Sequence, residues 1–444
     1  MTVTEEQTSA SDTSWFDQAG LGVFLHWGHA STQGWELSWQ LTGGVAGQFP
    51  ARAPVGCEEY FANSATFAPA HFDPRQWARE IRAAGARYIV LTAKHHDGFA
   101  MYETERSDYS SVTAPFGRDV VAEVLAAARA AGLRVGLYFS IIDWHHEDYP
   151  RYTDATVRKP YVVGDYPRAD DQAWARYREF MIGQLTELLT GYGELDMVWL
   201  DGEFEHTAAE WDFGAIRALI RHWQPACMVN DCCVGFGDFA SLEQQLEEVV
   251  PSGRRELCLT MNDSWGHVAG DTRWKSARDL VQLLVEARIS GANLLLNVGP
   301  RGDGTFPPEA SERLAAIGGW LDAHGESVYG ITPGLTRFQC RLPTGRRRTD
   351  AGERIYVYLT MLARDRLVIH DLPVRRVGAV TVLAGGAALP WSVVPRLADV
   401  HSHAPDPRGE LEIELGDGLG DGLCPVIAID LTTPTPTPTP KGSD

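Results

Sequence analysis

The sequence lacks the features of several large classes of protein. None of its apolar runs approaches the roughly 20 residues that a membrane-spanning helix needs, so we expect no membrane partner. Residues 1–15, MTVTEEQTSASDTSW, contain no basic start and no apolar run, which predicts that no secretory signal is present. Lys and Arg number only 39 against 59 Asp and Glu, and the net charge of −20 disfavours nucleic acid as a partner.

The seven cysteines are few, odd in number and scattered, at positions 57, 227, 232, 233, 258, 340 and 424. No CxxC pair occurs, so we expect no structural zinc site. Several cysteines fall inside apolar strand-like runs, which is typical of reduced, buried thiols. We therefore predict a cytoplasmic protein. Whether it forms a homo-oligomer is left open by the sequence.

What the sequence does contain is an alternation of apolar strand-like runs with helix-like segments over residues 15–334. Runs that are apolar throughout favour a parallel sheet that is covered on both faces. The predicted strands are residues 21–28, 87–96, 134–140, 195–202, 227–231, 256–263 and 292–300. The clearest predicted helices are residues 74–86, 118–132 and 275–291, and the last two end on a glycine.

This alternation predicts an α/β fold with a (β/α)8-like TIM barrel, and a doubly wound open sheet is the competing fold. The barrel is favoured because nearly every predicted strand ends in polar residues, and the strand ends of a barrel converge on one mouth. Short alternating segments then predict a C-terminal antiparallel β-sandwich over residues 335–432. Residues 1–14 are predicted to be a flexible N-terminus, and the Thr/Pro repeats of residues 433–444 a disordered tail.

The sharpest local feature is the segment MVWLDGEFEH, in which an apolar strand delivers Asp201 into a glycine. A strand-end aspartate often caps the turn or helix that follows it, and that is the alternative interpretation. In a barrel, however, Asp201 shares the mouth with His26, His95, His96 and Tyr138. This polar cluster is too rich for capping alone, so we expect Asp201 to take part in chemistry.

Two adjacent histidines, His95 and His96, stand in AKHHDGF at the end of a predicted strand. Adjacent strand residues point to opposite faces, so both can face one pocket only beyond the regular strand. A metal centre is the alternative, but residues 26–29 read His-Trp-Gly-His rather than the His-x-His of metal-dependent barrels. Neutral imidazoles that hydrogen-bond sugar hydroxyls are the favoured interpretation, and we expect no metal and no cofactor.

A glycosidase needs two carboxyl groups, and a retaining one holds them ~5–5.5 Å apart as nucleophile and acid/base. If Asp201 is the nucleophile, the second carboxyl must come from elsewhere at the mouth. The candidates by composition are Glu203, Glu205, Glu243, Glu247, Glu248 and Glu256. The residues alone do not choose among them, because loops set their positions.

Taken in order, the motifs FLHWG, AKHHDGF, GLYFS, VWLDG, SWGH and NLLLNVGPRGDG resemble those of the α-L-fucosidases of glycoside hydrolase family 29. The resemblance covers roughly residues 15–335. It implies a (β/α) barrel followed by a β-sandwich. It also implies the removal of terminal α-L-fucose from a fucosylated glycan or glycoconjugate, by retention and without a metal or organic cofactor.

The resemblance further implies roles for single residues. Asp201 in WLDG matches the nucleophile of the family, which forms a covalent fucosyl-enzyme ester that water then opens. The sugar-binding residues of the family are matched by His26, His95, His96, Tyr138 and Trp199.

The acid/base of the family has more variable surroundings. In some members it stands five residues after the aspartate of an Asp-Phe pair, and GDFASLEQQ has this arrangement with Asp238, Phe239 and Glu243. We therefore expect Glu243 to be the acid/base, with a pKa raised by burial. Glu256, in RELCLTMNDSWG, is the runner-up, because it matches a family glutamate that we interpret as supporting structure.

Two departures from the family pattern leave other functions open. The sugar-contacting Glu-Trp pair of many members corresponds here to Glu36 and Trp39, which are separated, and we expect Trp39 to serve at the sugar site. Cys232 stands where the family has the arginine of Asn-Asp-Arg, a planar and permanently charged donor. A hydrolase for a related sugar of L-galactose configuration is therefore one alternative. Others are a catalytically inactive carbohydrate-binding relative and a metal-dependent hydrolase.

Overall fold

The computed structural model describes most of the chain: residues 13–43, 55–149, 170–245, 253–361, 365–401, 403–404, 406–416, 419 and 422–433. By their contacts, the residues of the chain form two compact units, 1–275 with 293–315 and 276–292 with 316–444. The predicted boundary at 334/335 falls after β9 (Thr332–Pro333), which already belongs to an antiparallel sheet, and this division also assigns α8 (Ala277–Ile289) to the second unit. The predicted N-terminal segment up to residue 12 and the predicted tail from residue 434 lie outside the described residues.

The first unit is built around an eight-stranded parallel sheet in the order β5-β4-β3-β2-β1-β8-β7-β6. Its strands are β1 (Leu21–Leu25), β2 (Tyr88–Lys94), β3 (Arg134–Ser140), β4 (Met197–Asp201), β5 (Met228–Val229), β6 (Ala240–Glu243), β7 (Arg255–Thr260) and β8 (Ala292–Val298). The sheet is curled, and a parallel bridge between Asn230 and Phe239 brings its two edge strands, β5 and β6, together. The doubly wound open sheet is therefore not what the structure shows.

Seven of these strands coincide with predicted strands, and β6 is the one that the sequence analysis missed. Its four residues, ASLE, form no apolar run, and only Leu242 among them is buried. β1, β2, β4 and β8 are buried almost throughout, which is the pattern of a parallel sheet covered on both faces.

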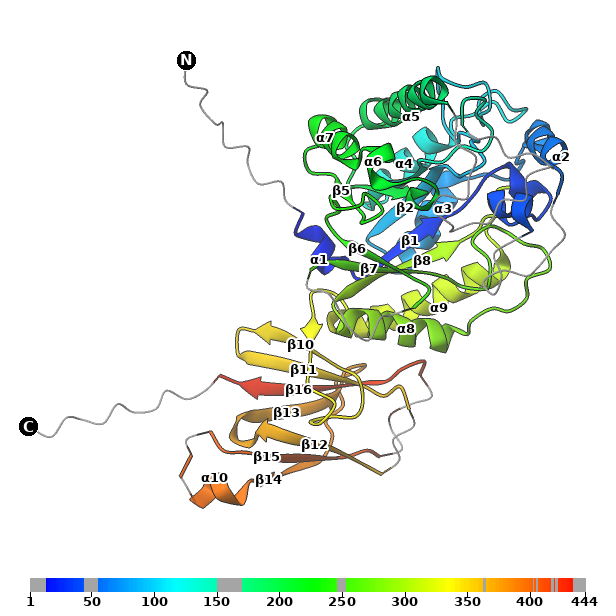
Figure 1. The fold of residues 1–444 in the computed structure, drawn as a ribbon. Coiled ribbons are helices and arrows are strands. Elements are labelled where there is room, and N and C mark those ends of the chain that lie inside the picture. The colour runs from blue at the N-terminus through cyan, green and yellow to red at the C-terminus, as the bar shows by residue number, and fades with distance from the viewer. Residues whose placement is uncertain are drawn as a thin grey trace, which may run out of the picture. The chain divides into compact units, whose positions relative to one another are not determined.

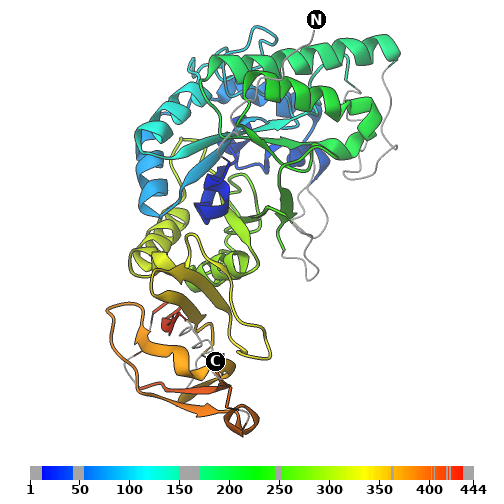
Figure 2. The ribbon, with the colours of Figure 1, turned by 90° about the vertical axis from the view of Figure 1, so that its left-hand side faces the viewer.

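Helices cover the outside of this sheet, as Figures 1 and 2 show for α3, α4, α5 and α7. The helices of the first unit are α1 (Trp15–Ala19), α2 (Cys57–Ala62), α3 (Pro74–Ala83), α4 (Val120–Ala130), α5 (Asp171–Gly191), α6 (Ala208–Trp211), α7 (Phe213–Trp223) and the start of α9 (Pro308–His324). Short 3-10 turns are η1 (His29–Thr32), η2 (Leu37–Thr42), η3 (Asn63–Thr66) and η4 (Glu203–Glu205).

The helices begin and end where local chemistry dictates. Asp73 caps α3 by accepting the backbone N–H groups of Arg75 and Gln76, and Pro74 occupies the first position, where its missing N–H costs nothing. The predicted glycine after α8 is Gly291, whose φ of 82° lies in the left-handed region that glycine adopts without strain. No helix in the described ranges combines the length and apolarity needed to cross a bilayer.

The second unit contains α8, the end of α9, η5 (Gly325–Ser327) and two antiparallel sheets. The sheets have the orders β13-β16-β11-β10-β9 and β12-β15-β14. Their elements are β9 (Thr332–Pro333), β10 (Thr344–Thr349), β11 (Gly352–Tyr358), β12 (Arg366–Pro373), η6 (Val374–Arg376), β13 (Val377–Val382), β14 (Trp391–Pro395), α10 (Leu397–His401), β15 (Arg408–Glu414) and β16 (Val426–Thr432). Apolar side chains from both sheets, such as Val357, Ile369, Ile413 and Ile429, form one buried cluster.

Candidate active site

A cavity of about 400 Å³ lies where the carboxyl ends of the parallel strands meet. This is the face at which parallel α/β folds place their ligands. The cavity is lined by Phe24, His26, Trp39, His95, Tyr138, Trp199, Asp201, Glu203, Phe204, Asp231, Cys232, Val234, Ser241, Glu243, Cys258 and Trp265. The list includes every predicted site residue except His96.

Asp201 is the last residue of β4, and two donors hold its carboxylate. The Tyr138 hydroxyl donates to Oδ2 at 2.6 Å, and the backbone N–H of Gly202 donates to Oδ1 at 2.7 Å. Burial, followed by the negative charge of Glu203, raises the pKa of Asp201, whereas the Tyr138 hydrogen bond lowers it. The carboxylate therefore has a fixed direction, and about a quarter of the side chain (24%) is exposed to the cavity.

Gly202 is required at this corner of the chain. Its φ is 103°, and a Cβ at this position would lie 2.6 Å from Cγ1 of Ile142. The glycine of the WLDG motif thus lets the chain turn sharply after Asp201. The turn leads into η4, which begins with Glu203 on the cavity wall.

The three predicted histidines surround the nucleophile candidate as buried, neutral rings. His26 Nδ1 lies 2.7 Å from Oδ1 of Asn297, and burial lowers the pKa of His26 to about 4. Burial likewise lowers the pKa of His95 well below its usual value and that of His96 to about 3. A neutral ring can accept or donate a hydrogen bond without placing a charge in the cavity.

β2 ends at Lys94, so His95 and His96 lie just beyond it, although the predicted strand ran to residue 96; of the two, His95 lines the cavity and His96 does not. Serine hydroxyls orient both rings: Oγ of Ser38 lies 2.6 Å from Nδ1 of His95, and Oγ of Ser140 lies 2.7 Å from Nδ1 of His96. His96 is fully buried, with Nε2 3.6 Å from Oδ2 of Asp201. It stands directly behind the cavity wall.

Aromatic rings form the remaining walls. Tyr138 stacks between His95 and Trp199, with ring centroids 5.6 Å and 5.9 Å away. Trp39, carried by η2, meets the His96 ring edge-on at 5.0 Å. Apolar ring faces next to hydrogen-bonding histidines suit a sugar, which presents C–H faces and hydroxyls together.

Glu243 ends β6 and places a second carboxyl in the cavity. Its register partner on β7 is Cys258, which also lines the cavity. The side chain of Glu243 is partly open to solvent, but the cavity walls remove enough water to raise its pKa, and the charge of Glu203 raises it further. Glu243 also contributes to the raised pKa of Asp201, so the two carboxyl groups interact.

Glu256, the runner-up for the acid/base, is placed differently. It is fully buried, does not line the cavity, and accepts hydrogen bonds from Nε1 of Trp199 at 3.1 Å and from the Tyr88 hydroxyl. Burial raises the pKa of Glu256 to about 7. One carboxyl oxygen accepts from Trp199 and the other from Tyr88, so both are occupied and Glu256 supports the cavity from behind.

Glu36 is also a supporting residue rather than a wall residue. Its carboxylate accepts the backbone N–H groups of Trp265 and Gly266 at 2.6 Å and 3.0 Å. It thereby fixes the loop that brings Trp265 into the cavity. Among the other composition-based candidates, Glu205 is buried against Trp144 and Tyr149, and Glu247 and Glu248 lie outside the described residues.

Several wall residues were missed by the sequence analysis. Phe24 and Trp265 stand in quoted motifs, and the inward alternation of FLHWG was a usable signal for Phe24. No signal pointed to Ser38, which η2 brings to His95, whereas Ser140 is the last residue of β3 in the GLYFS motif, where its hydroxyl meets His96.

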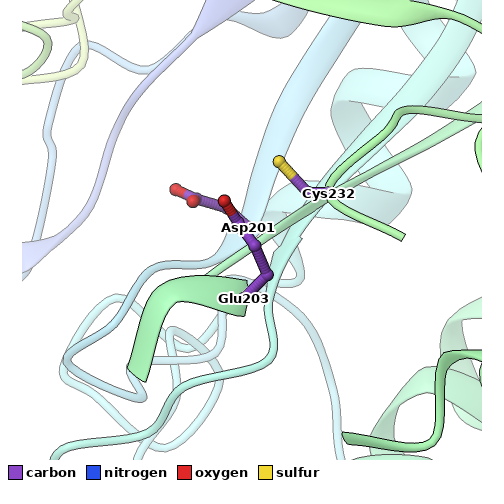
Figure 3. A group of neighbouring side chains, drawn as sticks. All are labelled: Asp201, Glu203 and Cys232. Atoms are coloured by element: carbon purple, nitrogen blue, oxygen red, sulfur yellow. The ribbon is translucent and has the colours of Figure 1, made fainter. Parts of the chain in front are cut away.

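Cys232 was noted only as a missing arginine, and the structure places its thiol near two carboxylates. In the described part of the chain, Asp201, Glu203 and Cys232 are the one group with metal-ligand spacing, their donor atoms lying within 4.8 Å of one another (Figure 3). The prediction that the enzyme needs no metal stays a prediction.

The combination of a parallel α/β sheet, two interacting carboxyl groups and a cavity of aromatic and neutral histidine side chains defines a glycoside hydrolase. Comparison with known proteins refines this class. The family model described as alpha-L-fucosidase matches residues 2–326.

A tissue alpha-L-fucosidase of Mus musculus is 32% identical over 339 residues, which are 72% of each chain. The solved structure of alpha-L-fucosidase isoenzyme 1 from Paenibacillus thiaminolyticus shares 30% identity with a TM-score of 0.76, and the match covers 95% of this chain and 98% of that one. A Bacteroides thetaiotaomicron alpha-L-fucosidase, solved as a trapped covalent intermediate, shares the fold at 22% identity and a TM-score of 0.77, covering 97% and 98%. This chain belongs to the alpha-L-fucosidase family.

Proposed function

We propose that the protein is a retaining exo-α-L-fucosidase that removes terminal α-L-fucose from a fucosylated glycan or glycoconjugate. The observation that carries this proposal is the pair of carboxyl groups in one cavity, with Asp201 fixed by Tyr138 and Gly202 and with Glu243 facing it from β6. Membership of the family supports fucose as the sugar.

In the first step, a carboxylate oxygen of Asp201 attacks the anomeric carbon of the fucose. The bond from that carbon to the glycosidic oxygen breaks, and the proton of Glu243 passes to the leaving oxygen. The product is a fucosyl ester of Asp201 with inverted configuration. The Tyr138 hydroxyl keeps the attacking carboxylate directed into the cavity.

In the second step, Glu243 acts as a base. It takes a proton from water, the water oxygen attacks the anomeric carbon, and the ester bond to Asp201 breaks. Two inversions give net retention. The raised pKa of Glu243 suits both roles, because it favours the protonated form that the first step needs and makes the carboxylate a stronger base in the second.

His26, His95 and Trp39 line the cavity and would bind the sugar, whereas the predicted binding residue His96 stands behind the wall beside Asp201. The His26 ring is oriented by Asn297 and the His95 ring by Ser38, and a neutral ring can bond a sugar hydroxyl without placing a desolvated charge in the cavity. The rings of Tyr138, Trp199 and Trp265 provide apolar contact for the C–H face and the methyl group of fucose.

A second candidate sugar is of L-galactose configuration, which differs from fucose by a hydroxyl in place of a hydrogen on the methyl carbon. The presence of Cys232 on the cavity wall favours this candidate, because Cys232 replaces the arginine of the family pattern and so changes the polar contacts open to the sugar. Relative kcat/KM on the aryl α-L-fucoside and the aryl α-L-galactoside distinguishes the two.

We further propose that the curled sheet is a closed (β/α)8 barrel and that the two C-terminal sheets form a sandwich. The Asn230–Phe239 bridge between the edge strands supports closure, and the shared apolar cluster supports the sandwich. A cytoplasmic location is proposed with them, and it is supported by seven free cysteines.

The proposed activity is tested with an aryl α-L-fucoside followed by NMR of the first product. We expect release of the aryl group and initial formation of α-L-fucose. Initial formation of β-L-fucose would contradict retention, and failure to cleave any aryl L-glycoside would contradict the enzyme proposal.

A further inference from the structure

The most unusual cluster in the cavity is formed by Asp201, Glu203 and Cys232. Asp201 ends β4, Glu203 follows it after one glycine, and Cys232 comes from the segment after β5. One carboxylate oxygen from each acid and the Sγ atom of Cys232 lie within 4.8 Å of one another (Figure 3). All three side chains line the cavity, so a small solute can reach them.

This set of donors matches the chemistry of a thiophilic divalent cation. Zn²⁺ binds thiolate at ~2.3 Å and carboxylate oxygen at ~2.0–2.2 Å, so donors on one ion lie no more than ~4.5 Å apart. The observed spacing requires only a small movement of the side chains. Sulfur as a donor favours Zn²⁺ or Cd²⁺ over Mg²⁺ and Ca²⁺, which prefer oxygen alone.

Two buried polar atoms at this site have no hydrogen-bond partner in the described structure. Oε2 of Glu203 is shielded from solvent and accepts no hydrogen bond. Nε2 of His96 also has none, and it lies 3.6 Å from Oδ2 of Asp201 on a side chain that is 0% exposed. Buried polar atoms without partners are costly, and a ligand at the site would satisfy them.

The charges around the cluster also favour a cation. Among the described residues, no lysine or arginine forms an ion pair with Asp201 or Glu203. The arginine that the family pattern places at position 232 would repel a cation, whereas Cys232 offers a sulfur donor beside two carboxylates.

We propose that Asp201, Glu203 and Cys232 form an inhibitory binding site for a thiophilic divalent cation such as Zn²⁺. The cation would occupy the carboxylate of Asp201 and the space of the sugar, so substrate and metal compete. The binding depends on the donor atoms alone, whereas the inhibition rests on the proposed role of Asp201 as nucleophile. The site regulates the enzyme and takes no part in turnover.

The binding is tested with Cd²⁺, whose bond to thiolate gives an ultraviolet charge-transfer band. The purified full chain is titrated with Cd²⁺ as wild type, Cys232→Ala, Cys232→Ser and Cys57→Ala. Cys57 is a half-buried thiol on α2 outside the cavity lining, which makes it a matched control. We expect the charge-transfer band of the highest-affinity Cd²⁺ site to appear in wild type and in Cys57→Ala. It should be lost in both Cys232 variants. An unchanged band in Cys232→Ala would overturn the site.

The inhibition is tested with Zn²⁺ on aryl fucoside hydrolysis. We expect Zn²⁺ to compete with the substrate. The inhibition constant, determined for each variant against its own activity without metal, should be about 10-fold or more higher in Cys232→Ser and Glu203→Gln than in wild type. Circular dichroism confirms that each variant is folded. A Cys232-dependent Cd²⁺ band without any Zn²⁺ inhibition would leave the site standing but would contradict its inhibitory role; the role of Asp201 as nucleophile is tested separately by Asp201→Ala.

Discussion

The two strands that deliver the catalytic carboxyl groups differ in almost every physical respect. β4 carries Asp201 and pairs in register with β3 from Met197 to the end of the strand, with β5 on its other side. β6 carries Glu243, pairs with β7 over only four residues, and meets β5 through the single Asn230–Phe239 bridge. Four of the five residues of β4 are buried, against one of four in β6.

This difference follows from what each carboxyl group must do. A nucleophile has to meet one carbon atom of one sugar, so rigid placement by neighbouring strands and by Tyr138 favours the reaction. An acid/base has to reach the leaving group, which varies from one glycan to another. A short, partly exposed strand can vary in sequence without disturbing the nucleophile.

The variant Asp201→Ala tests most strongly whether the nucleophile is carried by β4. We expect kcat for aryl α-L-fucosides to fall by ~10⁴-fold or more for every leaving group, because no ester can form. Azide should restore part of the activity and give the inverted β-fucosyl azide, since it attacks the substrate directly. A retained α-azide product would contradict Asp201 as nucleophile.

Glu243→Ala should behave differently. We expect a loss of ~10²–10⁴-fold on a glycan, and a much smaller loss on substrates whose leaving group needs no proton. Added azide would attack the fucosyl ester of Asp201 and give the retained α-azide. The same pattern from Glu256→Ala, with wild-type behaviour in Glu243→Ala, would reverse the assignment of the two glutamates.

Tyr138→Phe tests whether the rigid placement on the β4 side matters. The variant removes the 2.6 Å hydrogen bond to Asp201 and keeps the ring that stacks on Trp199. A hydrogen bond to a charged group contributes ~1.5–3 kcal/mol, so kcat should fall by ~10–100-fold while the melting temperature changes little. An unchanged kcat would show that this donor does not assist the nucleophile.

Glu256→Gln separates supporting structure from catalysis. Both oxygens of Glu256 accept hydrogen bonds, and a glutamine leaves either Trp199 or Tyr88 without an acceptor. We expect a loss of ~1–3 kcal/mol in the free energy of unfolding, measured with urea, and only a modest loss of kcat. Glu58→Gln, at an exposed position of α2, is the control and should cost almost nothing.

The smallest expected effect is a shift in the pH dependence of kcat/KM caused by Glu203→Gln. Loss of the Glu243 proton limits kcat/KM on the alkaline side, and the negative charge of Glu203 helps to keep that proton bound. Glu203→Gln removes this repulsion, which favours ionised Glu243, so its pKa falls and the alkaline limb moves to lower pH. A shift to higher pH would contradict this electrostatic coupling.

The same contrast between β4 and β6 explains what the sequence could predict. β4 is a buried apolar run that ends in Asp-Gly, so hydrophobic pattern and strand-end chemistry located Asp201. The alternation of strand side chains implied that His95 and His96 share one pocket only beyond the regular strand; β2 ends at Lys94, and His95 alone lines the cavity. The seven predicted strands are those with such runs.

β6 could not be predicted in this way, because its four residues form a strand only through contact with β7 and the edge of β5. Glu243 was therefore selected through a family resemblance and not through pattern. The pairing of Ser38 with His95 and the meeting of Cys232 with Glu203 depend on segments outside the regular strands, whose path spacing does not encode; Ser140, the partner of His96, instead ends β3.

The central claim, that Asp201 forms the covalent intermediate, is tested most directly by trapping it with 2-fluoro-fucosyl fluoride. The fluorine at C2 slows both steps, and the fluoride leaving group restores the first, so the ester accumulates. Proteolysis and fragmentation mass spectrometry then locate the label to a single residue. The structure predicts one fluorofucosyl group on Asp201. A label on Glu203 or Glu243, or no label on an active enzyme, would contradict it.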